Sequence, residues 1–210
     1  MESGSSSKRI FPPLYVSSGD ISADRLAFFH ILERLKTQKR TGWVDHKGPH
    51  FFIPSISDHM YRMALLAMCT SDAKLDVSKC VMMCLVHDLA EAQVGDIAPR
   101  EGITKAEKRK LEADAMHNFV YEMLHGSPAA LRIEDLWKEY EEGESDEAKF
   151  VKDLDRFEMA TQALEYERAH GAQTLQPFFD SSLPYVRHDE VKSWGNDLVQ
   201  EREKISLEGR

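Results

Sequence analysis

A group of ionisable residues follows an apolar stretch near the middle of the sequence. His87 and Asp88 are adjacent, Glu91 and Asp96 follow closely, and residues 81–86 before them are all apolar. We expect this stretch to lie inside a helix with hardly a polar side, which would bury the ionisable groups. A buried carboxylate is costly unless it is paired, hydrogen-bonded or bound to a metal. The pattern therefore predicts a buried polar site.

Two distant residues are candidate partners for this group. His59 lies on a predicted helix upstream, and Asp155 follows Val151 by four residues, on or beside the apolar stripe of a later helix. Two imidazoles and two carboxylates suit Mn, Fe, Co, Ni or Zn better than calcium, and such a set leaves positions open for water and phosphate. The predicted metal ligands are His59, His87, Asp88 and Asp155. We expect metal-assisted phosphate chemistry at this site.

Each of these residues has a simpler explanation when it is taken alone. His59 could be a surface or hydrogen-bonded core histidine, Glu91 could be solvated, and Asp155 could form an ion pair with Lys152. The combination of all of them in apolar helical context favours the metal site.

The composition restricts the class of ligand. The chain has 210 residues, room for one domain with a full core, and its formal net charge is −9. An acidic surface repels phosphate backbones, so we expect no nucleic-acid polymer as partner and predict a small phosphate compound instead.

Cysteine usage and hydropathy bear on the compartment. Cys69, Cys80 and Cys84 form an odd set without CxxC spacing, which predicts buried free thiols in a reducing compartment, the cytoplasm. No apolar stretch approaches membrane-spanning length, so we expect no membrane association. The Ser-rich start of the chain predicts a disordered tail, and a processed organelle-targeting segment is the alternative.

Helical periodicity and capping signals predict one all-α domain of about six or seven helices. We expect a flexible N-terminal tail over residues 1–22 and a helical domain over 23–205. Helices are predicted from near Ser22, after an N-cap at Ser57, from Val77 to about Gln93 with Asp76 as N-cap, from a Thr104–Glu107 capping box to about Leu124, and over 129–142, 147–170 and 190–203. On the sixth of these, the expected buried side carries Phe150, Val151, Leu154, Phe157 and Leu164.

Several of these motifs resemble a known family. The segments are 39–44 (KRTGWV), 57–63 (SDHMYRM), 85–91 (LVHDLAE), 94–99 (VGDIAP) and 148–155 (AKFVKDLD). Together they resemble the HD-domain metal-dependent phosphohydrolase superfamily, in the branch of HD domain-containing 5′-deoxynucleotidases. The resemblance covers roughly residues 25–205 and implies an all-helical HD-domain bundle.

The resemblance also implies an activity. Family members hydrolyse deoxyribonucleoside 5′-monophosphates to deoxynucleoside and phosphate. No Ser, Cys or His nucleophile is implied, so we predict direct attack of metal-activated water without a covalent intermediate. The implied cofactor is a divalent cation, Mn, Co or Mg before Zn, Ni or Fe, and a homodimer is a further implication.

Residue roles follow by position. His59, His87, Asp88 and Asp155 correspond to the family's metal ligands. Glu91 and Asp96 correspond to its catalytic acidic pair. Asp96 would handle the proton on water or on the leaving 5′-oxygen, and Glu91 would position water or phosphate. Alternatively, Glu91, Asp96 and the Ile97 carbonyl could hold a second ion.

Arg40 and Trp43 correspond to a substrate-binding pair of the family, although here two residues separate them. Arg40 would pair with phosphate oxygens, and Trp43 would pack where a 2′-hydroxyl would otherwise be. Equally, Arg40 could be a solvated charge at a helix end and Trp43 a core anchor.

Two rival functions remain open. The same ligands could serve another phosphoester, such as a cyclic nucleotide or a guanosine tetraphosphate alarmone. The chain could also be a non-catalytic nucleotide sensor, although such a sensor has no need of Glu91 and Asp96.

Overall fold

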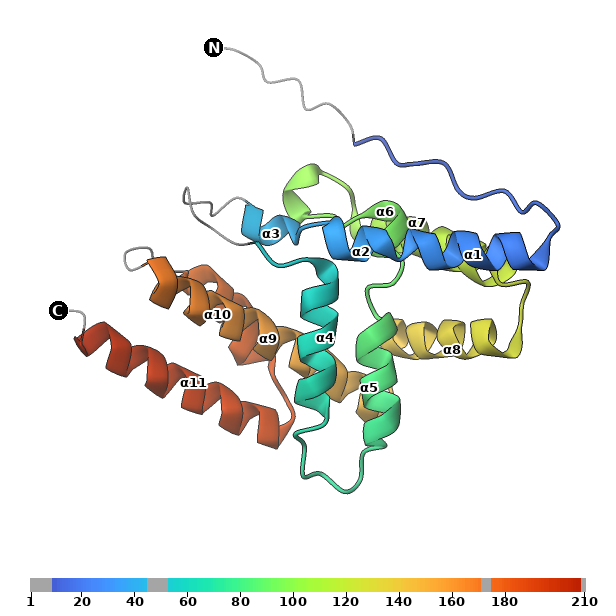
Figure 1. Cartoon of the computed structure of the whole chain (residues 1–210). Helices are drawn as coiled ribbons and strands as arrows, with labels where there is room; N and C mark the ends of the chain where they lie inside the picture. Colours follow the sequence, from blue (N-terminus) through green and yellow to red (C-terminus); the bar gives the residue numbers. More distant parts are fainter. Residues whose placement is uncertain (1–8, 45–52, 171–174, 209–210) are drawn as a thin grey trace, which may run out of the picture. The chain divides into compact units, whose positions relative to one another are not determined.

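The computed structural model describes residues 9–44, 53–170 and 175–208 (Figure 1). Regular structure in these residues is helical throughout, and the β-type pairing found among them is one isolated bridge between Lys39 and Ser55. The prediction of an all-α fold is confirmed. The chain forms two compact units, unit 1 with residues 1–58 and 88–134 and unit 2 with residues 59–87 and 135–210.

Unit 1 is built from several helices whose buried side chains are mainly aliphatic, with Phe28, Trp43 and Phe119 among them. Its elements are α1 (Ile21–Ile31), α2 (Glu33–Thr37), α3 (Thr41–Val44), α6 (Glu91–Val94), the 3-10 turn η1 (Pro99–Glu101), α7 (Lys105–His117) and the π-helical segment η2 (Asn118–Met123). The π segment packs on α1, where Phe28 and Phe119 meet edge to face with ring centroids 5.8 Å apart. α6 packs against both α2 and α7, which fixes the segment that follows His87 and Asp88.

An extended segment before α1 is bound to unit 1 through one buried carboxylate. Asp24 accepts hydrogen bonds from the hydroxyls of Tyr15 and Ser17, both at 2.6 Å, and from the backbone N–H of Ser18 at 2.9 Å. His125 Nε2 lies 2.9 Å from the same carboxylate. The Ser-rich composition predicts flexibility, but here short polar side chains converge on a single acceptor. Of the predicted tail, residues 1–8 lie outside the described residues.

Two amide side chains bind the backbone of the same segment. The Asn118 amide accepts from the N–H of Tyr15 at 3.2 Å and donates to its carbonyl at 2.8 Å. Gln93 Nε2 donates to the carbonyls of Pro12 and Pro13, at 2.8 and 3.1 Å. These bonds satisfy backbone groups that an extended chain otherwise leaves to water.

Unit 2 is organised around one long helix. Its elements are the greater part of α4 (Ile56–Ala67), α5 (Val77–Val86), the end of α8 (Pro128–Glu142), α9 (Asp146–His170), α10 (Gln176–Ser182), the 3-10 turn η3 (Leu183–Tyr185) and α11 (Asp189–Glu208). α9 packs against α5, α10 and α11 (Figure 1). Its predicted buried side is confirmed, because Phe150, Val151, Leu154, Phe157 and Leu164 are all at most 8% exposed.

Capping residues set several helix starts as predicted. The Asp76 side chain accepts from the Lys79 N–H at 3.0 Å and caps α5. Thr104 and Glu107 form the reciprocal capping box that begins α7. More helical segments form than the six or seven predicted, partly because α10, α2 and α3 are short and give weak periodicity.

Two predicted boundaries are wrong. α4 begins at Ile56, and its cap is Ser55, whose hydroxyl accepts from the Asp58 N–H at 3.1 Å while the Asp58 carboxylate accepts from the Ser55 N–H at 2.7 Å. Ser57 therefore lies inside the helix. The predicted helix from Val77 to Gln93 is broken after α5. The backbone N–H groups of Glu91, Ala92 and Gln93 donate to carbonyls three residues back, where a continuous α-helix would use the fourth residue back.

The membrane and cysteine predictions can be compared with the described residues. None of the described helices has both the length and the low polarity that a membrane crossing requires. All three cysteines are free thiols; Cys80 and Cys84 are buried as expected, whereas Cys69 is exposed, contrary to prediction.

Candidate metal centre

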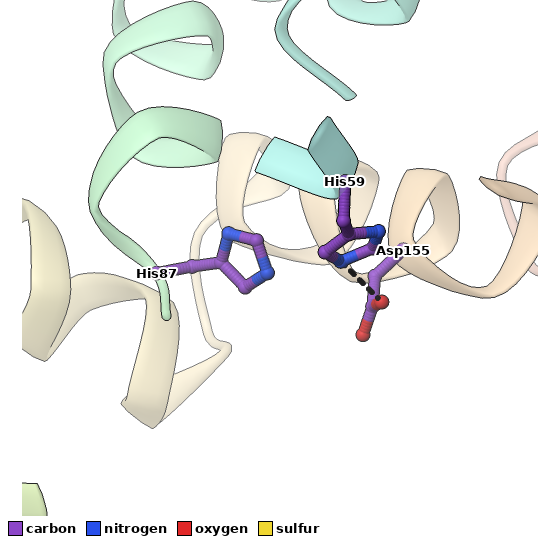
Figure 2. Close-up of side chains that lie close together, drawn as sticks. All are labelled: His59, His87 and Asp155. Carbon is purple, nitrogen blue, oxygen red and sulfur yellow. Dashed lines mark ion pairs between the residues drawn. The ribbon is translucent and has the colours of Figure 1, made fainter. Parts of the chain in front are cut away.

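Three of the predicted ligands meet within unit 2. His59 comes from α4, His87 directly follows α5, and Asp155 lies midway along α9 (Figure 2). Each offers one ligand atom, and these atoms all lie within 4.8 Å of one another. The histidines are 1% and 4% exposed, and Asp155 is half-buried, so the cluster opens on its carboxylate side.

Hydrogen bonds fix both imidazole rings through their Nδ1 atoms. His59 Nδ1 lies 2.7 Å from a carboxylate oxygen of Glu158, and His87 Nδ1 lies 2.9 Å from the Cys84 carbonyl. The Cys84 carbonyl and an ionised Glu158 carboxylate only accept hydrogen bonds, so each Nδ1 donates, and in the neutral ring each Nε2 keeps its lone pair. His59 Nε2 is accordingly turned to Asp155, with 3.2 Å between Nε2 and the nearest carboxylate oxygen (Figure 2).

Aromatic packing supports the second ring. The Tyr140 ring lies beside His87 with centroids 5.0 Å apart, and the Lys152 ammonium lies 4.0 Å from the centroid of Tyr140. Lys152 is thus engaged with an aromatic ring.

The donor set fits a divalent transition metal. Two imidazole nitrogens and one carboxylate oxygen, on α4, on α9 and at the end of α5, match the ligand preferences of Mn, Fe, Co, Ni and Zn. Hydrogen-bonded Nδ1 atoms are the usual second contact of metal-binding histidines. These residues are therefore able to hold a metal ion.

The predicted fourth ligand, Asp88, belongs to unit 1. Its carboxylate lies 3.9 Å from an Arg40 guanidinium nitrogen. Arg40 directly precedes α3, and its side chain is largely buried, so it is not the fully solvated charge that the sequence left open. Trp43, on α3, is 2% exposed and thus has the burial expected of a core anchor.

The predicted catalytic residue Glu91 lies buried at the start of α6. Burial raises the pKa of Glu91 well above its ordinary value, and the negative charges of Asp88 and Asp96 add to the rise. Lys108 on α7 partly offsets this, with its ammonium 3.7 Å from the Glu91 carboxylate. Burial opposes the charge of Lys108, but Glu112 and Glu91 raise the pKa of Lys108.

Asp96 is fixed from two sides. Its carboxylate accepts from the backbone N–H of Thr41, and its carbonyl accepts from the Thr41 hydroxyl at 2.8 Å and from Arg9 Nη1 at 2.9 Å. Arg9 also donates to Glu101 at 2.9 Å. The neighbouring Ile97, whose carbonyl was a candidate for a second ion, is buried at 5% exposure.

Sequence reasoning missed three residues of these environments: Glu158, Lys108 and Arg9. Glu158 follows Asp155 by three residues and so shares its face of α9, a spacing that could have identified it. The contact of Lys108 with Glu91 joins two different helices, and Arg9 is 87 and 92 residues from Asp96 and Glu101, so neither carries such a signal.

Comparison with known proteins agrees with this geometry. The sequence profile of the HD domain matches residues 32–192. The 5′-deoxynucleotidase hdd1 of Schizosaccharomyces pombe is 42% identical, over 85% of this chain and 90% of its own length. The human 5′-deoxynucleotidase HDDC2 is 44% identical, over 88% and 89% of the two chains.

Solved structures give the same result. The HD domain-containing protein YGK1 of Saccharomyces cerevisiae superposes with a TM-score of 0.69 at 30% identity, covering 90% of each chain. The PH0347 protein of Pyrococcus horikoshii superposes with a TM-score of 0.65 at 26% identity, over 85% of this chain and 98% of its own. Because the HD domain profile covers residues 32–192 and these relatives match over most of their length, this chain belongs to the HD domain family.

Proposed function

We propose that this protein is a metal-dependent 5′-deoxynucleotidase, which hydrolyses deoxyribonucleoside 5′-monophosphates to deoxynucleoside and phosphate. The observation that carries the proposal is the convergence of His59, His87 and Asp155. Support for the substrate class comes from relatives named 5′-deoxynucleotidase, which are 42% and 44% identical over most of their length.

Four residues are assigned to the metal. His59, His87 and Asp155 supply three ligands, and Asp88 is proposed as the fourth because it directly follows His87 in the chain. Mn, Co or Mg is the proposed ion, with Zn, Ni or Fe as alternatives. When bound, a divalent cation supplies Lewis-acid polarisation of a phosphoryl oxygen and lowers the pKa of water.

Asp96 and Glu91 are the proposed catalytic carboxylates. Asp96 is proposed to accept the proton of the attacking water or to return one to the leaving 5′-oxygen, and its contacts with Thr41 and Arg9 hold it in one orientation. Glu91 is proposed to position water or phosphate. The alternative remains that Glu91, Asp96 and the Ile97 carbonyl hold a second ion.

Substrate binding is assigned to Arg40 and Trp43. The planar Arg40 guanidinium suits two phosphate oxygens. Trp43 is proposed to exclude a 2′-hydroxyl, and its burial favours a rigid wall over a mobile contact. The net charge of −9 favours small nucleotides over nucleic-acid polymers as ligands.

Two coarser features complete the proposal. Three free thiols favour a reducing compartment, and we infer the cytoplasm. A homodimer is inferred from the family resemblance, and light scattering of the purified protein tests it.

Phosphate release from metal-stripped protein tests the function. Mn, Co, Mg or Zn is restored, and deoxy- and ribonucleoside 5′-monophosphates are offered to wild type, Asp88→Ala and Asp155→Asn. Asp146→Asn is the matched control, because it lies on the same helix with its side chain 84% exposed. We expect metal-dependent turnover, faster for deoxynucleotides, that both site variants lose and the control keeps.

Two results would redirect the assignment. Release only from cyclic nucleotides or an alarmone would identify another phosphoesterase. Nucleotide binding without turnover under any metal would identify a sensor.

A further inference from the structure

Glu158 is a buried carboxylate to which neither the ligand set nor the catalytic pair assigns a role. It lies on α9 three residues after Asp155, and it is 2% exposed. Burying a carboxylate is costly unless both oxygens are satisfied, so its partners indicate why it is there.

Its two oxygens contact two residues of α4. One oxygen lies 2.7 Å from His59 Nδ1, and the other lies 3.1 Å from Arg62 Nε. His59 and Arg62 are three residues apart, on one face of α4, and they face the side of α9 that carries Asp155 and Glu158.

A purely structural role would require only the Arg62 contact. Arg62 is already bound to α9 by two hydrogen bonds of 2.8 Å to the Glu165 carboxylate and by a further one to Gln162. The helix pair is thus held without His59, yet the shorter contact of Glu158 is the one to the imidazole.

The consequence for His59 is a fixed tautomer. A carboxylate paired with a guanidinium only accepts hydrogen bonds, so Nδ1 must donate, and in the neutral ring that binds a metal ion Nε2 presents its lone pair toward Asp155 and His87. His87 is fixed in the same way by the neutral Cys84 carbonyl. Glu158 therefore adds a negative charge behind one of the two imidazole ligands.

We propose that Glu158 is a positioning residue of the metal centre. It holds His59 in the orientation and tautomer that bind a divalent cation, and it makes Nε2 of His59 a stronger electron-pair donor to the metal. This inference rests on the proposed metal site. Carboxylate partners of metal-binding histidines typically contribute about 10- to 100-fold in metal affinity.

The first test measures metal affinity rather than turnover. Metal-stripped wild type, Glu158→Gln and Glu165→Gln are titrated with Mn²⁺ by calorimetry, and Co²⁺ absorption spectra report the coordination. Glu165→Gln is the matched control, because Glu165 lies on the same helix and contacts Arg62, and its side chain is 48% exposed.

We expect Glu158→Gln to weaken Mn²⁺ binding about 10- to 100-fold and to change the Co²⁺ spectrum, with Glu165→Gln close to wild type. Equal weakening in both variants would reduce Glu158 to a support for Arg62 and overturn the inference. Unchanged affinity in Glu158→Gln would overturn it as well, whereas failure of wild type to bind any ion would overturn the metal site itself.

A second measurement needs no variant that might misfold. The ¹⁵N chemical shifts of His59 in metal-free wild type distinguish the two tautomers of the neutral ring. A hydrogen on Nδ1 is expected, and a hydrogen on Nε2 would contradict the proposed role.

Discussion

Two glycines on either side of the segment that carries Asp96 and Glu101 provide a test of how Arg9 is bound. Gly95 has φ +71° and ψ 167°, a region occupied essentially by glycine alone, and Gly102 has φ +72° and ψ 11° in the left-handed region. A Cβ on Gly95 would lie 2.1 Å from Arg9 Nη2, whereas one on Gly102 would have no neighbour within 4 Å. The pair therefore separates backbone strain from displacement of Arg9.

The cost of each change to alanine can be worked out from this geometry. Gly102→Ala should lower the free energy of unfolding by about 1–2 kcal/mol, the cost of the left-handed conformation for a residue with a Cβ. Gly95→Ala should cost about 1–3 kcal/mol of strain. It must also move Arg9 off Asp96 and Glu101, whose part-exposed contacts with Arg9 contribute about 1 kcal/mol.

Urea unfolding of the two alanine variants, with and without Arg9→Ala, measures these quantities. In the Arg9→Ala background the cost of Gly95→Ala should fall by about 1 kcal/mol, while the cost of Gly102→Ala stays the same. Phosphate release should fall in Gly95→Ala, because the next residue is Asp96. If Arg9→Ala leaves the cost of Gly95→Ala unchanged, the guanidinium does not lie over this glycine and the reasoning fails.

Two further predictions concern burial and charge. Burial opposes the ionised form of Asp24, but hydrogen bonds from Ser17, Tyr15 and Ser18 outweigh it and lower the pKa of Asp24 below its ordinary 3.8. The ionised carboxylate therefore stabilises the folded state above about pH 4, and this stabilisation is lost as the pH falls. Wild type should therefore lose more stability than Asp24→Asn between about pH 5 and 3 in urea midpoints, and parallel curves would contradict this. One thiol per native chain, the exposed one, should react rapidly with a thiol reagent, because burial raises the pKa of Cys80 to about 12; rapid reaction of all three would refute it.

Local signals in the sequence predicted the long elements of the fold. The buried side of α9 follows from apolar residues at helical spacing, and the starts of α5 and α7 follow from Asp76 and Thr104, whose caps act within three residues. Such signals depend on neighbours along the chain, so a single sequence contains them.

Features set by distant contacts could not be predicted in this way. The break after His87 and the bound segment before α1 depend on tertiary packing, which overrides an apolar run or a Ser-rich composition. Of the site, His59, His87 and Asp155 meet as predicted, whereas the roles of Asp88 and of the catalytic pair stay predictions. The spacing of Glu158 from Asp155 could have placed it on the same face of α9, but its contact with His59, 99 residues away, could not be predicted.

The way in which unit 1 binds the segment before α1 has a consequence for sequence comparison. Asn118 and Gln93 contact carbonyls and an N–H of this segment, groups that every ordinary residue provides. The side chains of Pro12 and Pro13 can diverge among relatives while these backbone contacts persist, unlike the hydroxyls of Tyr15 and Ser17 that bind Asp24. Similarity to the HD domain begins at residue 32, but the folded part of this chain begins well before it. A recombinant fragment that begins at residue 32 would therefore expose the side-chain amides of Asn118 and Gln93 and would lack a folded segment that the family profile does not include.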